Sequence, residues 1–157
     1  MAINYDKLMS LKHPVKEFTY TERDSMLYAL GIGFGADPED EAELRFVYEK
    51  NLLAVPTMAV VLASPDGWLR NPETGIKYLK LMHGEQTLQL HRPLAAAATV
   101  VGRTRVRAIV DKGPDKGAVI VQSGELTDRT TGERIATVER FLFARAEDPD
   151  LGLRPGG

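Results

Sequence analysis

Four long stretches rich in β-branched and aromatic residues fill the second half of the chain and constrain its fold most strongly. Short segments that carry proline, glycine or aspartate separate the stretches, as is typical of turns. The stretches cover residues 81–91, 98–110, 118–126 and 134–143. Because neighbouring strands joined by turns pair with each other, the pattern predicts an antiparallel meander.

The first half of the chain carries a helix signal. Thr21 is an N-cap candidate with an acidic residue three positions later, and Gly31 follows a short apolar stripe. We therefore expect a surface helix over about residues 22–30. The acidic, glycine-containing segment 31–43 is typical of a solvated loop.

Two further segments of the first half have a weaker pattern. Residues 44–48 alternate apolar and polar side chains in part and predict a short strand. The apolar run 57–63 fits either a buried strand or a buried helix. Pro56 before the run and a Ser-Pro-Asp-Gly stop after it favour a helix. We expect an α+β domain in which this helix covers one face of the sheet.

The composition excludes several classes of protein. The 157 residues, about one domain's length, include 20 Lys plus Arg and 22 Asp plus Glu, so we expect no nucleic-acid partner and no membrane surface. The chain has no cysteine, which excludes disulfides and thiolate metal sites. Residues 1–17 lack a signal-peptide pattern, and the longest apolar run, residues 55–63, is too short to span a bilayer. These features predict a soluble, cytoplasmic protein.

Three patterns that would indicate a catalytic or ligand site are either absent from the sequence or lie in the wrong structural context. Residues 31–36 match the letters G-x-G-x-x-G/A, but a dinucleotide site needs a strand before them, and here a predicted helix precedes them. His13, His83 and His91 lack the spacing of metal ligands, so we expect no metal site. The sequence also lacks the G-x-S-x-G motif of serine hydrolases.

Two clusters leave alternatives open. Arg103, Arg105 and Arg107 would place three guanidinium groups on one face of a strand. They could meet the phosphates of a coenzyme or form a solvated outer face of the sheet. Gly84 lies next to His83 inside a strand pattern and indicates a bulge, which could serve local geometry or a ligand contact.

The segment around this bulge also carries a family resemblance. His83-Gly84-Glu85-Gln86 and the following residues 90–94 resemble the N-terminal half of the hydratase 2 family. These are the MaoC-like (R)-specific enoyl-CoA hydratases that include the hydratase part of peroxisomal multifunctional enzyme type 2. The resemblance runs from about Phe18 to Phe143. Further matching motifs precede the bulge in the same order, at residues 20–24, 27–33, 46–49 and 55–57.

The resemblance implies a hot dog fold, in which an antiparallel sheet wraps around a central helix, and a substrate-binding unit made of two such halves. The family hydrates trans-2-enoyl-CoA to (R)-3-hydroxyacyl-CoA, with an acid/base pair from an Asp-x-Asn-Pro-x-His motif in its C-terminal half. That motif is absent here. At the sole Asn-Pro of this chain, Asn71-Pro72, Leu69 replaces the Asp and Thr74 replaces the His. The resemblance therefore implies no catalytic residue in this chain.

The leading hypothesis is a non-catalytic, acyl-CoA-accommodating half of an (R)-specific enoyl-CoA hydratase or 3-hydroxyacyl-CoA dehydratase in fatty acid metabolism. Coenzyme A enters as part of the acyl-CoA thioester substrate, and no separate cofactor is expected. The expected substrate-binding side chains are apolar and adaptable or belong to the bulge, although ordinary core has a similar composition. These residues are Val55, Pro56, Thr57, Met58, Trp68, Met82, His83 and Gly84.

Assembly and activity follow from the same hypothesis. A single hot dog over residues 1–146 leaves a sheet edge exposed, so we expect a homodimer or a heteromer with a catalytic hot dog subunit. Residues 147–157 resemble a linker. The alternatives are a homodimer that holds acyl-CoA without turnover and a stand-alone dehydratase or thioesterase. A stand-alone enzyme of either kind would use Glu85 with His83. We expect these two side chains to share a strand face only if Gly84 is bulged.

Overall fold

The structure is a computed structural model that describes residues 4–62, 64, 67–113 and 116–145. The predicted linker-like tail, residues 147–157, lies outside the described residues. The α+β class is confirmed, and no helix in the described ranges is long and apolar enough to cross a lipid bilayer. The elements are α1 (Tyr5–Ser10), β1 (Lys16–Tyr20), α2 (Glu22–Gly31), α3 (Glu41–Leu44), the 3₁₀ helices η1 (Pro56–Val60), η2 (Trp68–Arg70), η3 (Pro72–Thr74) and η4 (Tyr78–Lys80), and the strands β2 (Leu81–Leu90), β3 (Ala98–Asp111), β4 (Ala118–Asp128) and β5 (Arg134–Ala144).

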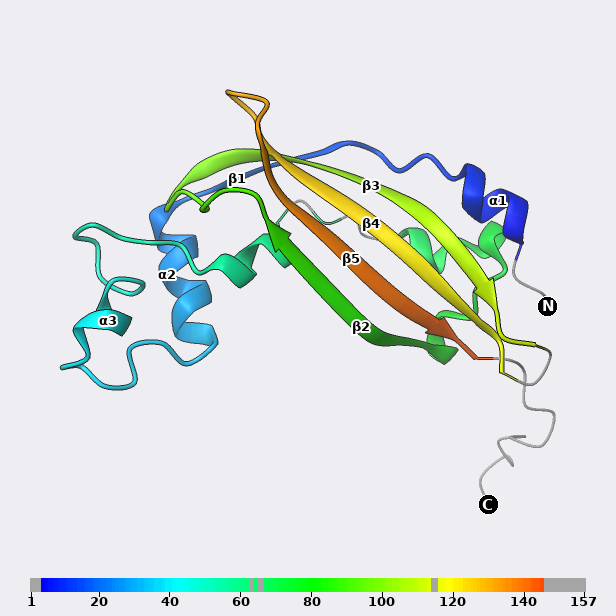
Figure 1. The fold of residues 1–157 in the computed structure, drawn as a ribbon, viewed down its shortest axis with the longest axis horizontal. Helices are drawn as coiled ribbons and strands as arrows, with labels where there is room; N and C mark the ends of the chain where they lie inside the picture. The colour runs from blue at the N-terminus through cyan, green and yellow to red at the C-terminus, as the bar shows by residue number, and fades with distance from the viewer. Residues whose placement is uncertain (1–3, 63, 65–66, 114–115, 146–157) are drawn as a thin grey trace, which may run out of the picture.

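All five strands form one antiparallel sheet in the order β1-β3-β4-β5-β2 (Figure 1). The four strands predicted in the second half of the chain are confirmed as β2 to β5, and β3, β4 and β5 form a meander. The prediction that β2 joins this meander next to β3 is wrong, because β2 pairs with β5. The backbone amides of His91 and Arg92 still bond to the Ile135 carbonyl of β5, at 2.8 and 3.4 Å. The chain thus leaves β5 only after Arg92 and crosses to β3 by a connection longer than a hairpin turn.

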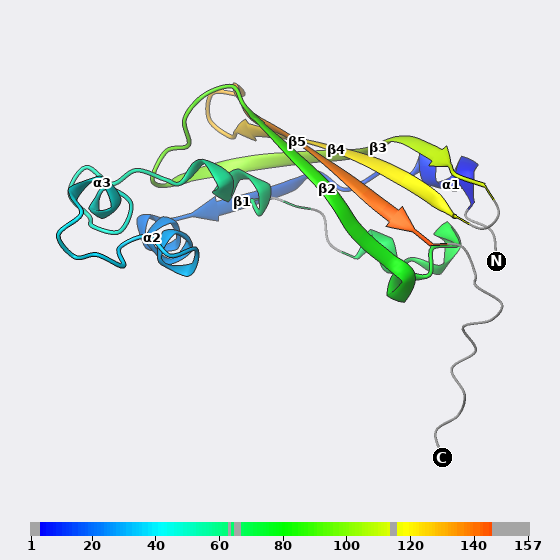
Figure 2. The same ribbon diagram turned by 60° about the horizontal axis from the view of Figure 1, so that its bottom comes forward.

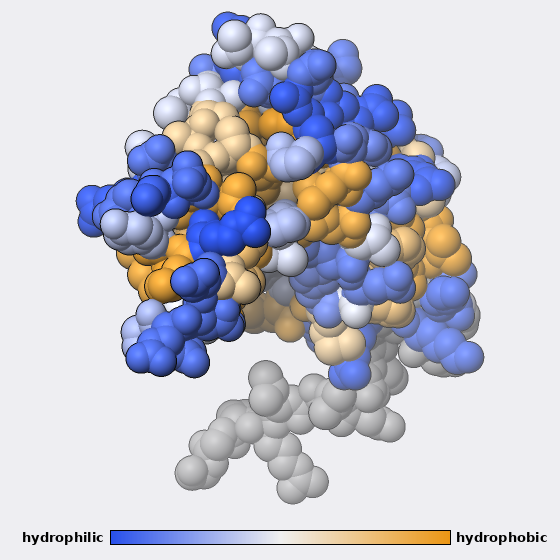
Figure 3. Space-filling view, turned by 60° about the vertical axis from the view of Figure 1, so that its left-hand side comes forward, coloured by the Kyte–Doolittle hydropathy of each residue, from blue (hydrophilic) through white to orange (hydrophobic). Residues whose placement is uncertain are grey.

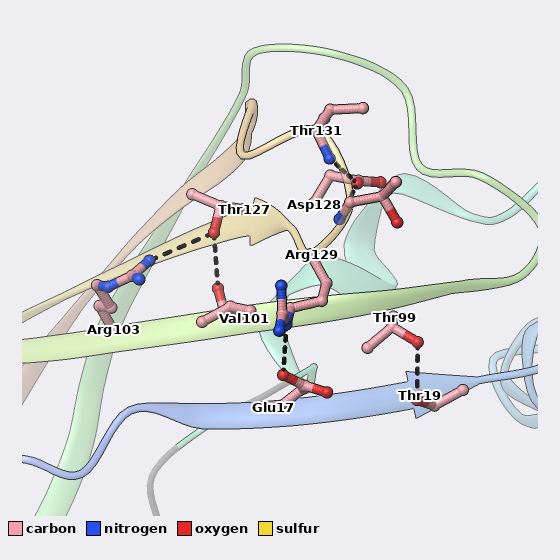
Figure 4. A network of polar contacts seen from close by, with 10 residues as sticks. Glu17, Thr19, Thr99, Val101, Arg103, Thr127, Asp128, Arg129 and Thr131 are labelled. Atoms are coloured by element: carbon pink, nitrogen blue, oxygen red, sulfur yellow. Dashed lines mark hydrogen bonds and ion pairs between the residues drawn. The ribbon is translucent and has the colours of Figure 1, made fainter.

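The edge strand β1 was not predicted, since Tyr20 is its only buried residue and the strand lacks an alternating pattern. It pairs with β3. Polar side chains reinforce this pairing on one face of the sheet, as Figure 4 shows. The Arg129 guanidinium donates to the Glu17 carboxylate at 2.8 Å, and the hydroxyls of Thr19 and Thr99 lie 2.8 Å apart. These contacts are exposed, so backbone pairing supplies most of the attachment.

The short helices cover one face of the sheet, which we call the inner face; in the described part of the chain no helix covers the opposite, outer face. Figure 2 shows α2 and η1 below one end of the sheet and the green 3₁₀ turns before β2 below the other end. Each end holds an apolar cluster. The first contains Tyr20, Ala54, Met58, Ala59, Leu62, Leu94, Val100, Leu126, Ile135 and Ala136. The second contains Leu8, Ile76, Val106, Ile120, Leu142 and Ala144.

The helix expected over residues 22–30 is confirmed as α2. Its N-terminus is a capping box: the Asp24 carboxylate accepts from the Thr21 amide at 2.8 Å, and the Thr21 hydroxyl accepts from the Asp24 amide at 3.4 Å. These hydrogen bonds hold the pKa of Asp24 below its usual range. Past the helix, Gly33 and Gly35 adopt φ angles of +102° and +78°. The glycine motif is therefore a helix end followed by a loop.

Two predictions for the first half need correction. The strand expected at 44–48 is wrong, because α3 ends at Leu44 and turns follow. The Asp40 carboxylate caps α3 by accepting from the amides of Ala42 and Glu43, which outweighs a partial alternation. The helix expected through residue 63 is a 3₁₀ helix that ends at Val60, so the central helix of the sheet is short. Residue 63 lies outside the described residues.

Candidate functional site

An open groove lies on the inner face of the sheet, between the C-terminal end of η1 and the 3₁₀ turns η2 and η4. Its volume of about 630 Å³ falls in the range of small-molecule pockets, about 300–1,000 Å³. Strands β2, β4 and β5 form its floor. The residues that line it are Val60, Val61, Trp68, Leu69, Tyr78, Leu79, Leu81, His83, Gln86, Gln122, Arg140 and Leu142.

The walls of the groove are largely apolar and exposed. Val61 follows η1 and is 57% exposed, while Tyr78 and Leu79 of η4 are 43% and 96% exposed. Exposed apolar side chains gathered around one groove are typical of a site that a ligand or a protein partner covers. The groove is therefore the best candidate for binding an apolar ligand.

The floor of the groove carries polar side chains. Gln86 of β2, Arg140 of β5 and Gln122 of β4 lie opposite one another in the sheet. Arg140 Nη2 donates to the Val60 carbonyl at 2.7 Å and to the Ser64 hydroxyl at 2.6 Å. Arg140 thus fastens the end of η1 to the sheet at the point where the groove begins.

The predicted bulge at Gly84 is confirmed, since the pairing of β2 with β5 shifts between His83 and Glu85. His83 lies opposite Leu142 and Glu85 lies opposite Phe141. Consecutive residues of a strand point to opposite faces, so His83 shares the inner face with Leu142 and Glu85 lies on the outer face. The expectation that a bulge would bring Glu85 and His83 to one face is therefore wrong.

The bulge serves local packing on the outer face. A methyl group added at Gly84 would overlap the ring of Phe143, which lies in the place of a side chain there. Met82, 45% exposed, is paired with Phe143 and shares that face. Neither Gly84 nor Met82 is among the described residues that line the groove. Of the expected substrate-binding residues, only Trp68 and His83 line it.

The other four expected residues lie at the start of η1. Val55 and Met58 are buried, at 5% and 4% exposure, and Met58 belongs to the first apolar cluster. Pro56 and Thr57 are exposed, and the Thr57 hydroxyl lies 3.1 Å from the Tyr28 hydroxyl. The structure thus places these residues beside the groove's end wall and in the core.

The Asn-Pro segment has a structural role. The Asn71 side chain accepts from the Glu73 amide at 3.0 Å and caps η3. Thr74, at the position of the histidine in the family motif, is fully buried and donates to the Asn71 carbonyl at 2.7 Å. This hydroxyl is therefore committed to the local turn and does not reach the groove.

The three arginines of β3 lie on the outer face, opposite the groove. Arg103, Arg105 and Arg107 line a shallow surface there. Arg107 pairs with Glu139 of the same surface, and both side chains belong to an open, mixed-charge face. Of the two alternatives predicted from the sequence, this environment favours a solvated outer face.

His13 packs behind one wall of the groove. Its ring meets Trp68 edge to face, with centroids 5.0 Å apart and an interplanar angle of 81°. Both ring nitrogens are shielded from solvent without a hydrogen-bond partner. Burial lowers the pKa of His13 from its ordinary value of 6.5. The neutral imidazole is therefore the form that fits this wall.

We expect the free energy of unfolding to decrease as the pH falls below about 6.5. The unfolded chain takes up a proton at His13 there, whereas the folded chain takes it up only at lower pH. His13→Phe keeps a ring against Trp68 and removes the titration. Urea unfolding between pH 7 and pH 5 should show a smaller decrease for the variant. Equal pH dependence in both proteins would contradict this assignment.

Comparison with known proteins agrees with this architecture. The chain is 34% identical over 151 residues to enoyl-CoA hydratase 2, peroxisomal, of Arabidopsis thaliana, covering 90% of this chain and 48% of that protein. It is 32% identical over 158 residues to 3-hydroxyacyl-thioester dehydratase Y of Mycobacterium tuberculosis, covering 98% of this chain and 52% of that protein. The chain thus spans about half the length of these curated relatives.

A solved structure and a family profile complete the comparison. A MaoC-like dehydratase from Phytophthora capsici matches with a TM-score of 0.71 and 28% identity, over 92% of this chain and 50% of that one. The sheet and the groove thus define a hot dog domain of the MaoC-like dehydratase class. Residues 18–146 match the MFE-2 hydratase 2 N-terminal domain, and the chain belongs to that family.

Proposed function

We propose that this chain is the non-catalytic, acyl-CoA-accommodating half of an (R)-specific enoyl-CoA hydratase or 3-hydroxyacyl-CoA dehydratase, and that it works with a catalytic hot dog domain. One observation carries the proposal. The groove has apolar walls suited to an acyl chain, yet no carboxylate is among the described residues that line it. A hydratase needs an acid and a base around the reacting water, so this half can hold a substrate without converting it.

The stand-alone dehydratase or thioesterase is the weaker reading. It needs Glu85 to act with His83, and the bulge separates these side chains onto opposite faces of the sheet. The names of the relatives, an enoyl-CoA hydratase 2 and a 3-hydroxyacyl-thioester dehydratase, support an acyl thioester as the ligand of this chain.

The β2 edge is the place where we propose that the partner half binds. None of its ten residues is buried, it is twice as long as the five-residue edge strand β1, and the groove opens beside it. A long, unpaired edge is a template for another strand. Leu79, at 96% exposure, lies just before β2 and adds apolar surface to this edge.

A second exposed apolar surface lies at the α2 end of the molecule. Leu27, Leu30 and Ile32 are each at least half exposed. Figure 3 shows this end, with hydrophobic residues grouped around the middle of the view and hydrophilic residues around them. Exposed apolar surface at two places favours an assembly over a free monomer.

We expect the purified chain to self-associate at micromolar concentration. Leu79→Glu should weaken the association at least about tenfold, since a carboxylate in an apolar interface loses its hydration. Val15→Glu is a matched control, because Val15 is also exposed, at 59%, and lies before the opposite edge strand. Light scattering across a dilution series gives the dissociation constants. A monodisperse monomer for the unsubstituted chain would contradict the prediction.

Binding of decanoyl-CoA tests the proposed function directly. Val61→Trp should fill the groove from an exposed position, 57% accessible, and weaken binding about tenfold or more. Val110→Trp places the same bulk at an exposed position on β3 outside the described lining of the groove, and should leave binding unchanged. Isothermal titration calorimetry with free coenzyme A as reference measures the effect of the acyl chain. Equal affinities for decanoyl-CoA and coenzyme A would overturn the proposal.

A further inference from the structure

A row of polar side chains crosses the inner face between the two apolar clusters. Gln86 is paired with Arg140, and Arg140 is paired with Gln122, so the three lie side by side on strands β2, β5 and β4. All three line the groove. The floor of the groove therefore changes from apolar to polar at one level along the strands.

Gln122 is the unusual member of this row. The residue is 3% exposed, and its side chain lines the groove instead of being enclosed in either apolar cluster. It also lines a cavity of about 30 Å³ beside η1, which shares Val60 and Arg140 with the groove. A side-chain amide that lines a groove presents its donors and acceptor to whatever fills the groove, a ligand or water.

The residues that precede Gln122 in β4 are apolar. Val119, Ile120 and Val121 precede Gln122 and are all buried, and Ile120 lies on the same face of the sheet as Gln122. The primary amide offers two N–H donors and one carbonyl acceptor to a ligand in the groove. Because the amide is neutral, it suits an uncharged oxygen such as a ketone or a hydroxyl.

We propose that the acyl chains held in this groove carry a keto or hydroxyl oxygen beyond C3, and that the Gln122 amide hydrogen-bonds to it. This inference rests on the proposed function, because the groove must first hold an acyl chain. Gln86 belongs to the same row, on the edge strand β2, and is half-buried. It offers a second amide to the oxygen. The preferred substrates are therefore oxygenated acyl-CoA thioesters and not plain alkyl ones.

The test compares decanoyl-CoA with a series of oxodecanoyl-CoA isomers in which the ketone moves from C5 to C9. The unsubstituted chain should bind one isomer about tenfold more tightly than decanoyl-CoA, as one hydrogen bond in a buried site allows. Gln122→Met keeps the length and the apolar stem of the side chain, and this variant should bind decanoyl-CoA and the preferred isomer equally. Gln89→Met is the matched control, since Gln89 is exposed on β2 and pairs with Thr137, which lines the outer-face surface; it should keep the preference.

A second measurement needs no variant. The side-chain ¹⁵N–¹H signals of Gln122 should shift on addition of the preferred isomer and stay in place with decanoyl-CoA. Binding of decanoyl-CoA and every isomer with equal affinity would overturn this inference alone and assign the amide to a bound water, for which the cavity has room. Failure of the folded chain to bind any acyl-CoA better than coenzyme A would overturn the proposed function.

Discussion

Purified alone, this chain is expected to hydrate trans-2-decenoyl-CoA at least about 10⁴-fold more slowly than a family member that carries the Asp-x-Asn-Pro-x-His motif. One positioned acid or base contributes about 10²–10⁴-fold, and one oxyanion donor about 10²–10³-fold. His83 is the one histidine among the described residues that line the groove, and none of those residues is a carboxylate. A lone imidazole supplies only part of the required pair.

Loss of the conjugated enoyl absorbance measures this rate. Glu85→Gln should leave any residual rate unchanged, because Glu85 lies on the outer face, and His83→Ala can remove only the contribution of one unpaired imidazole. Addition of a catalytic hot dog domain should restore turnover if this chain supplies the acyl-binding half. Robust turnover by the chain alone that either substitution abolishes would contradict the prediction and establish a stand-alone enzyme.

The strands of the second half could be predicted because each is long and rich in β-formers, a signal that lies entirely within the segment. The position of β2 could not. Whether it pairs with β3 or with β5 depends on a crossing connection, and the backbone contact of Arg92 with Ile135 that delays this crossing joins residues 43 positions apart. The same holds for β1, which has only five residues and whose partner lies in β3.

The candidate site was predicted less completely than the fold. His83, which belongs to the bulge motif of the resemblance, and Trp68, an apolar side chain, were both predicted to bind substrate, and both line the groove. Gln122 and Arg140 were missed, although a glutamine directly after three apolar β-formers was a signal in the sequence. Side-chain direction past a bulge depends on register, so Glu85 could be placed only in three dimensions.

Met58 and Met82 could not be distinguished as pocket candidates from the sequence, because burial distinguishes them only in the fold. Both are adaptable apolar side chains near motifs of the resemblance. In the fold, Met58 packs in the first apolar cluster, with the Ser25 hydroxyl 3.7 Å from its sulfur, whereas Met82 lies on the outer face. A substitution at Met58 therefore tests the stability of the apolar core, and a substitution at Met82 tests the exposed outer face.

Met58→Glu is expected to unfold the chain at neutral pH. Met58 is 4% exposed among apolar side chains, and a carboxylate there would lose its hydration without a cation in the described cluster to replace it. An uncompensated buried charge costs about 3–5 kcal/mol, and the lost packing adds to a total stability of only about 5–15 kcal/mol. Circular dichroism melting curves should show a large decrease in Tm or no folded baseline.

The pH dependence of this variant identifies the cause. Burial raises the pKa of the new carboxyl above the ordinary value of about 4.3, so the unfolded state releases its proton first as the pH rises. Stability lost at pH 7 should therefore return in part near pH 5. Met58→Leu should cost less than about 1.5 kcal/mol, and Met82→Glu, at a 45% exposed position, should change stability by about 0.5 kcal/mol or less. A wild-type Tm for Met58→Glu would contradict the burial of Met58 and place it in an accessible pocket.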